Sequence, residues 1–139
     1  MLRLFVMVLL GMTFLKSANA EEANYPAVEP ILKTSATILD QPLVYPMTGA
    51  AEVTAVIVTL KPGEKTSSHL HEVPLFGYVL QGELTVYYEH HGTKLYKTGD
   101  ALMEAEDIWH IGENTGEVPM RILAVFMGAK GAKNSVTKE

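Results

Sequence analysis

Apolar and polar stretches alternate along this chain, and turn residues separate them at intervals of roughly 8–12 positions, as in all-β domains. Residues 53–60 are rich in β-branched side chains and end at the turn signal Lys61-Pro62-Gly63. After residue 20 no long stretch repeats its apolar positions with a helical period. The pattern therefore predicts an all-β sandwich or barrel of short strands, covering residues 31–39, 53–60, 66–71, 77–81, 83–88, 93–97, 101–105 and 120–127.

The first 20 residues differ from this pattern. Arg3 precedes a 12-residue apolar run, and Ala18 and Ala20 provide the small residues that signal peptidase requires. A membrane span needs about 20 apolar residues, so this run is too short, and Lys16 closes it. We therefore expect residues 1–20 to be a signal peptide that is cleaved after Ala20. A retained anchor and a buried N-terminal helix are the alternatives.

The rest of the chain divides into three parts. Residues 21–46 contain four prolines and are expected to be an irregular, Pro-rich N-terminal segment in which 31–39 forms an edge strand. Residues 47–128 are expected to form the barrel. Residues 129–139 carry three lysines and are expected to be a flexible polar tail.

Composition narrows the class of protein. Hydrophobic residues make up 47% and charged residues 19%, which indicates a globular chain, and 139 − 20 = 119 residues suffice for one domain. The formal charge is −5, and it becomes −7 without Arg3 and Lys16, which argues against nucleic-acid binding. The chain has no cysteine, so disulfides and thiolate metal sites are excluded. Any metal must be held by His, Asp, Glu or similar groups.

Three of the five histidines are candidate metal ligands. His69 and His71 are two positions apart, so on a strand both imidazoles point to the same face and form a two-ligand clamp. The same pair also occurs on solvated strands. His110 follows two large apolar residues and is either a third ligand or a hydrogen-bonded core histidine. His90 and His91 precede Gly92 at a predicted hairpin tip, so we exclude them from the site.

Two spaced motifs resemble those of the cupin superfamily, in particular its small single-domain members with a type-2 conserved barrel. The first is Gly63-(5)-His69-x-His71-(3)-Leu75-(6)-Gly82, and the second is Gly99-(5)-Ala105-x-Asp107-(2)-His110-(3)-Asn114. The resemblance covers about residues 30–128. It implies a single-domain antiparallel β-barrel of jelly-roll type with a metal in its mouth, and it implies that His69, His71 and His110 are the ligands.

The sequence departs from the family pattern at one ligand position. Leu75 stands where the first motif usually has a Glu ligand, so the site resembles the minority of three-His cupins, which include thiol and diketone-cleaving dioxygenases. Ala105 and Asp107 replace the Pro and Gly of the second motif, which are turn positions. A three-His site without a carboxylate leaves more coordination positions open and favours an anionic substrate.

Other residues are candidates for supporting roles. Glu104 is a charge within an apolar strand, so it either contacts a ligating histidine, supplies a fourth ligand or faces solvent. Glu72 is a weaker ligand candidate because it should point away from His71. Tyr78 and Trp109 are candidate pocket residues, although core packing is commoner for aromatics. Asn114 matches the second motif and is expected in a turn or behind the ligands.

Two functions remain open at this point. One is an exported mononuclear non-haem metalloenzyme, an oxidoreductase of dioxygenase type acting on a small organic molecule. The other is a cupin that binds a metal or small ligand without chemistry. Fe²⁺ is the favoured metal, with Zn²⁺, Mn²⁺ and Ni²⁺ as alternatives. The expected location is the periplasm in a Gram-negative source and otherwise outside the cell. The expected partners are a small molecule and a second copy of the chain, with no nucleic acid and no stable membrane anchor after cleavage.

Overall fold

The computed structural model describes residues 28–46 and 49–138, and this part of the chain contains strands, turns and loops but no helix. The all-β class predicted from the sequence is confirmed. The expected signal peptide lies outside the described residues. The strands in chain order are β1 (Ala51–Leu60), β2 (His69–Leu70), β3 (Leu75–Gln81), β4 (Glu83–Tyr88), β5 (Gly92–Lys97), β6 (Ala101–Met103), β7 (His110–Glu113), β8 (Met120–Ala129) and β9 (Val136–Thr137).

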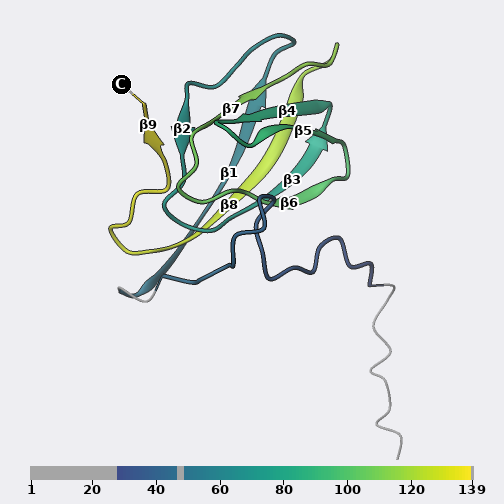
Figure 1. Cartoon of the computed structure of the whole chain (residues 1–139). Helices are drawn as coiled ribbons and strands as arrows, with labels where there is room; N and C mark the ends of the chain where they lie inside the picture. The colour runs from purple at the N-terminus through teal and green to yellow at the C-terminus, as the bar shows by residue number, and fades with distance from the viewer. Residues whose placement is uncertain (1–27, 47–48, 139) are drawn as a thin grey trace, which may run out of the picture.

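The strands form two antiparallel sheets (Figure 1). One sheet has the order β1-β8-β3-β6, and the other has the order β5-β4-β7-β2-β9. Neighbours in a sheet are often far apart in sequence, as in a jelly roll: β1 pairs with β8 along its whole length, from Ala51 opposite Ala129 to Leu60 opposite Met120. The two sheets are not joined into a closed barrel.

The core lies between the two sheets because each strand turns alternate side chains inward. On β8, Met120 and Ile122 are buried, and Leu84 and Val86 of β4 contribute from the opposite sheet. Burial of such side chains contributes about 1.5–3 kcal/mol each. This apolar layer holds the two sheets together, and several of its side chains also line a cavity, described below.

The N-terminal segment differs from its expected structure. Residues 31–39 do not form a strand: among the described residues they make one isolated bridge, between Ala36 and Pro42, and the Ile38 N–H donates to the Met103 carbonyl of β6 at 2.8 Å. The chain instead turns back on itself, since the Thr37 N–H donates to the Gln41 carbonyl at 2.9 Å and Asp40 has φ 61°. Asp tolerates this left-handed conformation, and Pro42 has no N–H to continue a ladder.

The C-terminal segment also differs from its expected structure. The strand β8 continues to Ala129, and Val136–Thr137 forms β9, which pairs with β2. The Lys138 N–H donates to the Ser68 carbonyl at 2.9 Å, and Lys138 Nζ lies 3.0 Å from Glu89 Oε1. The expectation of a flexible tail is therefore wrong for these residues. Polar composition favoured a solvated tail, but an edge of β2 was free to pair with it.

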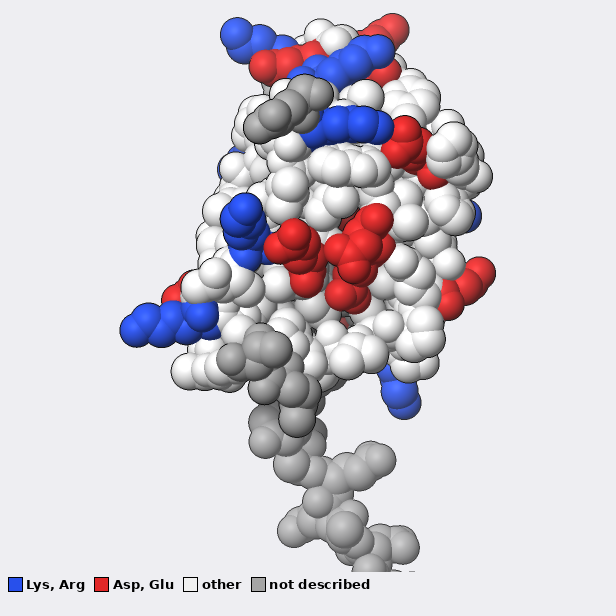
Figure 2. All heavy atoms as spheres, turned by 60° about the vertical axis from the view of Figure 1, so that its left-hand side comes forward, with Lys and Arg blue, Asp and Glu red and all other residues white. Residues whose placement is uncertain are grey.

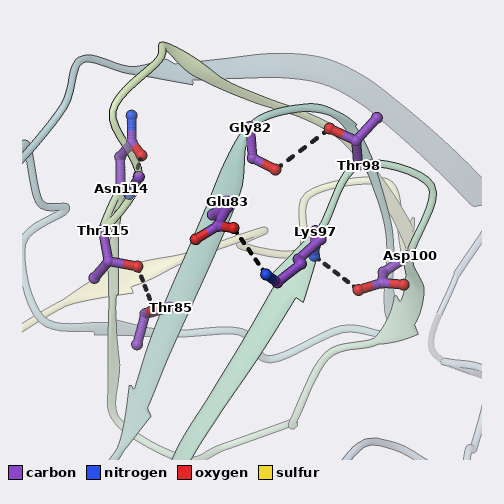
Figure 3. Close-up of polar contacts among 9 residues, drawn as sticks. Gly82, Glu83, Thr85, Lys97, Thr98, Asp100, Asn114 and Thr115 are labelled. Carbon is purple, nitrogen blue, oxygen red and sulfur yellow. Dashed lines mark hydrogen bonds and ion pairs between the residues drawn. The ribbon is translucent and has the colours of Figure 1, made fainter.

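Turns that follow β3, β5 and β7 are held by polar contacts, some of which Figure 3 shows. Gly82 connects β3 to β4 with φ 76°, and its carbonyl accepts the Thr98 hydroxyl at 3.3 Å. Asn114 is fully buried, and its Nδ2 donates to the carbonyls of Leu60 at 3.0 Å and Val118 at 2.8 Å. Asn114 therefore joins turns, which confirms the turn alternative of its predicted role.

Charges are interspersed on the face shown in Figure 2, where acidic and basic side chains lie among larger uncharged areas. Three ion pairs occur among the described residues, and all involve exposed lysines, so each contributes little to stability. The described residues include no helix that is long and apolar enough to cross a membrane.

Candidate metal centre

Three imidazoles from two distant parts of the chain, the β2 region and the start of β7, converge in one place. His69 lies on β2, His71 follows directly after that strand, and His110 begins β7. The strands β2 and β7 are neighbours, and His69 is paired with His110 across them. The ring centroids are 4.4 Å apart for His69 and His110 and 5.0 Å apart for the other two pairs. One nitrogen from each ring lies within 4.8 Å of the other two.

Backbone carbonyls determine which nitrogen each ring presents. Nδ1 of His69 lies 2.8 Å from the Ser67 carbonyl, Nδ1 of His110 lies 2.8 Å from that of Ile108, and Nδ1 of His71 lies 2.9 Å from that of Asn134. A carbonyl only accepts, so each Nδ1 must carry the proton. Each neutral ring then has its lone pair on Nε2, the form in which imidazole binds a metal.

Burial keeps these rings neutral. His71 is 4% exposed and His110 is 3% exposed. Burial lowers the pKa of His71 to about 4, although its bond to Asn134 opposes this shift, and burial also lowers the pKa of His69 and of His110. All three imidazoles are therefore unprotonated near pH 7. Three buried lone-pair donors facing one another suit a divalent cation, so the cluster could hold a metal ion.

The histidines line one wall of a cavity of about 160 Å³ between the sheets. Leu75 lies in the same lining and is 6% exposed, so it places an alkyl group where the resemblance would place a carboxylate. Ser135 also belongs to the lining. The rest of the lining is mostly apolar: Val58, Leu60, Leu84, Val86, Met120, Ile122, Ala124 and Phe126.

Glu104 is the carboxylate in this cavity lining, and it is hydrogen-bonded to the protein. It is 6% exposed, which excludes the solvent-facing alternative. The Tyr88 hydroxyl donates to its Oε1 at 2.5 Å, and the Ala105 N–H donates to the same atom at 2.9 Å. Burial raises the pKa of Glu104, and the Tyr88 bond opposes that shift. Among the described residues, the cluster of ligand atoms comprises the three histidines without Glu104.

Tyr88 connects Glu104 to the histidines, and sequence reasoning missed it. Its ring centroid lies 5.6 Å from that of His110, and burial raises the pKa of its hydroxyl far above the usual range. It therefore stays a protonated donor to Glu104. The alternation of β4, which turns Leu84, Val86 and Tyr88 to the same side, was the available signal.

The other candidates lie away from the cavity. Tyr78 occupies β3 between buried Gly77 and Val79, so it points to the opposite face from Leu75. Trp109 lines a separate hollow of about 210 Å³ on the outside, beneath Lys138 Nζ at 5.4 Å from its ring centroid. Neither residue belongs to the lining of the cavity beside the histidines. Three further side chains, those of the weaker candidate Glu72 and of the excluded His90 and His91, are exposed.

Comparisons with known proteins agree with this fold. A family model described as Cupin domain matches residues 56–126. No curated protein matches the chain. Among solved structures, the Lactobacillus farciminis oxalate decarboxylase formate complex is 23% identical with a TM-score of 0.54, over 61% of this chain and 26% of that one. A Bacillus subtilis oxalate decarboxylase described with Mn(II) centers is 22% identical with a TM-score of 0.54, over 61% and 23%. This chain thus spans about a quarter of those proteins, and at such identity the likeness shows the fold alone.

Proposed function

This chain belongs to the cupin family, and from that membership together with its three converging histidines we propose that it is a metal-dependent, dioxygenase-like oxidoreductase acting on a small organic molecule. The observation that carries the proposal is the set of three Nδ1-anchored imidazoles, each with a nitrogen within 4.8 Å of the other two, in the lining of a cavity. We further propose that it acts outside the cytoplasm.

The donor set limits the metal. Three neutral imidazoles suit Fe²⁺, Zn²⁺, Ni²⁺ and Mn²⁺ when water or substrate completes the coordination. We favour Fe²⁺, and the Mn(II) centers of the Bacillus subtilis protein support Mn²⁺ as an alternative. Bound at this position, such an ion would act as a Lewis acid toward an oxygen or sulfur donor of the substrate and would leave room for O₂.

The cavity walls select the substrate. Leu75 supplies no charge, so three neutral ligands leave the positive charge of a metal uncompensated, and an anionic or enolate-like group is favoured. The apolar side chains of β8 line the space beside the histidines, so this part of the cavity favours an apolar group of the substrate. A small molecule with one charged end and an apolar body fits this lining.

Glu104 and Tyr88 could handle a proton at the wall of the site. Buried Glu104 accepts a hydrogen bond from the Tyr88 hydroxyl. Burial raises the pKa of Glu104, so this carboxyl binds a proton at a higher pH than an exposed one does. This pair is therefore the candidate acid–base group for a substrate seated against the histidines.

A second function, metal or ligand binding without chemistry, is favoured by one specific observation. The Tyr88 hydroxyl and the Ala105 N–H both donate to the same oxygen of Glu104, so the protein itself holds this carboxylate. A carboxylate held in this way can serve to rigidify the wall rather than to move a proton.

Elemental analysis and oxygen uptake separate the two functions. Protein purified from its own host would be assayed for metal and then screened for O₂ consumption with diketones, thiols and phenols. Bound iron together with uptake that disappears in His110→Ala supports the oxidoreductase. Bound metal without O₂ consumption on any of these three substrate classes favours the binding protein. A protein without metal affinity contradicts both functions.

A further inference from the structure

The three histidines of the cluster are anchored in two different ways. His69 and His110 each bond to the carbonyl two residues earlier in the chain, at 2.8 Å, so their own strands orient them. His71 instead bonds to the carbonyl of Asn134, 63 residues later, at 2.9 Å. The Ser135 hydroxyl lies 3.0 Å from the same Nδ1. The orientation of one ring out of three therefore depends on the C-terminal segment.

We propose that residues 134–138 are part of the metal centre and that the Asn134 carbonyl and Ser135 position His71 for the metal. The inference rests on the proposed metal-binding function. Ser135 lines the same cavity as the histidines, so the segment both anchors the ring from behind and closes one side of the site.

Several contacts hold this segment in place. The strand β9 pairs with β2, with Val136 opposite Leu70 and Thr137 opposite His69. The Lys138 N–H extends the pairing by donating to the Ser68 carbonyl at 2.9 Å. The Lys138 side chain reaches Glu89 at 3.0 Å. These contacts fix the backbone of β9, and through it the position of the Asn134 carbonyl beside His71.

Loss of this carbonyl would leave His71 free to exchange tautomers and to rotate. In the Nε2–H tautomer the lone pair would point away from the other two rings, and the ring would have to convert before it could bind. Removing the hydrogen-bond partner behind a ligating histidine typically lowers metal affinity by about 10–100-fold. We expect a loss of that size when β9 is displaced.

The experiment compares two variants that displace the carbonyl with one that does not. In Val136→Pro the ring of proline disrupts the pairing with Leu70, and a chain ended after Lys133 removes the acceptor altogether. Thr137→Ala is the matched control, because it changes an exposed side chain on the same strand and keeps the backbone. Zn²⁺ affinity is measured by competition with a chelating dye, and imidazole ¹⁵N shifts of metal-free protein report the tautomers.

The expected result is a 10–100-fold loss of Zn²⁺ affinity in Val136→Pro and in the shortened chain, with wild-type affinity in Thr137→Ala. His71 should show mixed tautomers in the first two proteins, while His110 keeps its single Nδ1–H form. Retention of wild-type affinity and of a single His71 tautomer in the shortened chain would overturn the inference, whether or not Val136→Pro folds.

The two readouts also separate this inference from the proposed function. If the wild-type chain binds no Zn²⁺, Mn²⁺ or Fe²⁺, the proposed function fails. The tautomer of His71 in metal-free protein still decides the inference, because it tests whether the C-terminal segment positions the ring.

Discussion

Leu75 and Glu104 define the chemistry of this site at the scale of single residues. Leu75 lines the cavity beside the histidines, so no carboxylate comes from the position where the family motif usually has one. Glu104 lines the same cavity, but its Oε1 already accepts hydrogen bonds from the Tyr88 hydroxyl and from the Ala105 N–H. The potential ligand atoms that lie together are thus one nitrogen from each of the three imidazoles. The imidazoles are neutral because they are buried.

We predict that His69→Ala, His71→Ala and His110→Ala each remove most of the bound metal and leave the protein folded. Each change deletes one of three donors, while the apolar layer of β4 and β8 remains intact. Metal content and circular dichroism measure the two effects. Replacing exposed His90 and His91 together by Ala is the control and should leave the metal content unchanged. Full metal occupancy in any of the three single variants would exclude that residue as a ligand.

We predict that Leu75→Glu tightens divalent metal binding by adding a negatively charged oxygen donor at the edge of the cluster. If the metal supports oxygen chemistry, activity should fall as affinity rises, because an open position becomes filled. Titration of Zn²⁺ into wild type, Leu75→Glu and Glu104→Gln measures this effect. Weaker binding in Leu75→Glu, combined with severe metal loss in Glu104→Gln, would instead show that Glu104 is already a ligand.

At the scale of secondary-structure elements, short strands and turns fix the positions of the side chains in the site. The strand β2 has two residues, yet it lies between β7 and β9 and so brings His69 opposite His110. Elsewhere in the fold, Gly82 connects β3 to β4 with φ 76°. A Cβ added to Gly82 would lie 2.9 Å from the Pro119 carbonyl oxygen. That turn therefore has no space for a side chain.

We predict that Gly82→Ala destabilises the protein by about 2–4 kcal/mol, because it adds a steric clash to the cost of a left-handed conformation. Gly63→Ala is the matched control: Gly63 has φ 77°, but nothing lies within 4 Å of an added Cβ, so only about 1 kcal/mol should be lost. Urea unfolding measures both. Equal losses in the two variants would show that the contact with Pro119 is relieved at no cost.

Stability and metal binding should be coupled at the scale of the whole molecule. The histidines come from the strands β2 and β7 and from the loop after β2, and the C-terminal segment contacts one of them. Folding is needed to bring these groups together, because they are up to 41 residues apart in the chain even without the C-terminal contact. A metal that binds only the folded state stabilises it.

We predict that a divalent metal raises the unfolding temperature of this protein. Free metal at 100 times the dissociation constant should add about 2.7 kcal/mol to the free energy of unfolding. Thermal unfolding with added Zn²⁺ and with a chelator measures the shift. The His71→Ala variant should show little response, and an equal shift in that variant would mean that the metal acts elsewhere.

We also predict that the protein is exported and that its mature form begins at Glu21. Ala18 and Ala20 suit signal peptidase, and the acidic pair Glu21-Glu22 follows directly. N-terminal sequencing of protein secreted by its own host checks the cleavage site. Changing Ala20 to a bulky residue should block processing, and a mature chain that still starts at Met1 would contradict the prediction.

The sequence alone determined the fold class and indicated which three histidines lie together. Strand periodicity, turn residues and two spaced histidine motifs are local features, and β4 spans the predicted residues 83–88. Strand alternation is local too, so it could have identified Tyr88. Other features depend on contacts across the chain, which a linear pattern does not contain. The pairing of β9 with β2, the bond from His71 to Asn134 and the capture of Glu104 by Tyr88 join residues 16 to 68 positions apart. Only the tertiary structure decided these, because a polar residue is solvated in one fold and bonded in another.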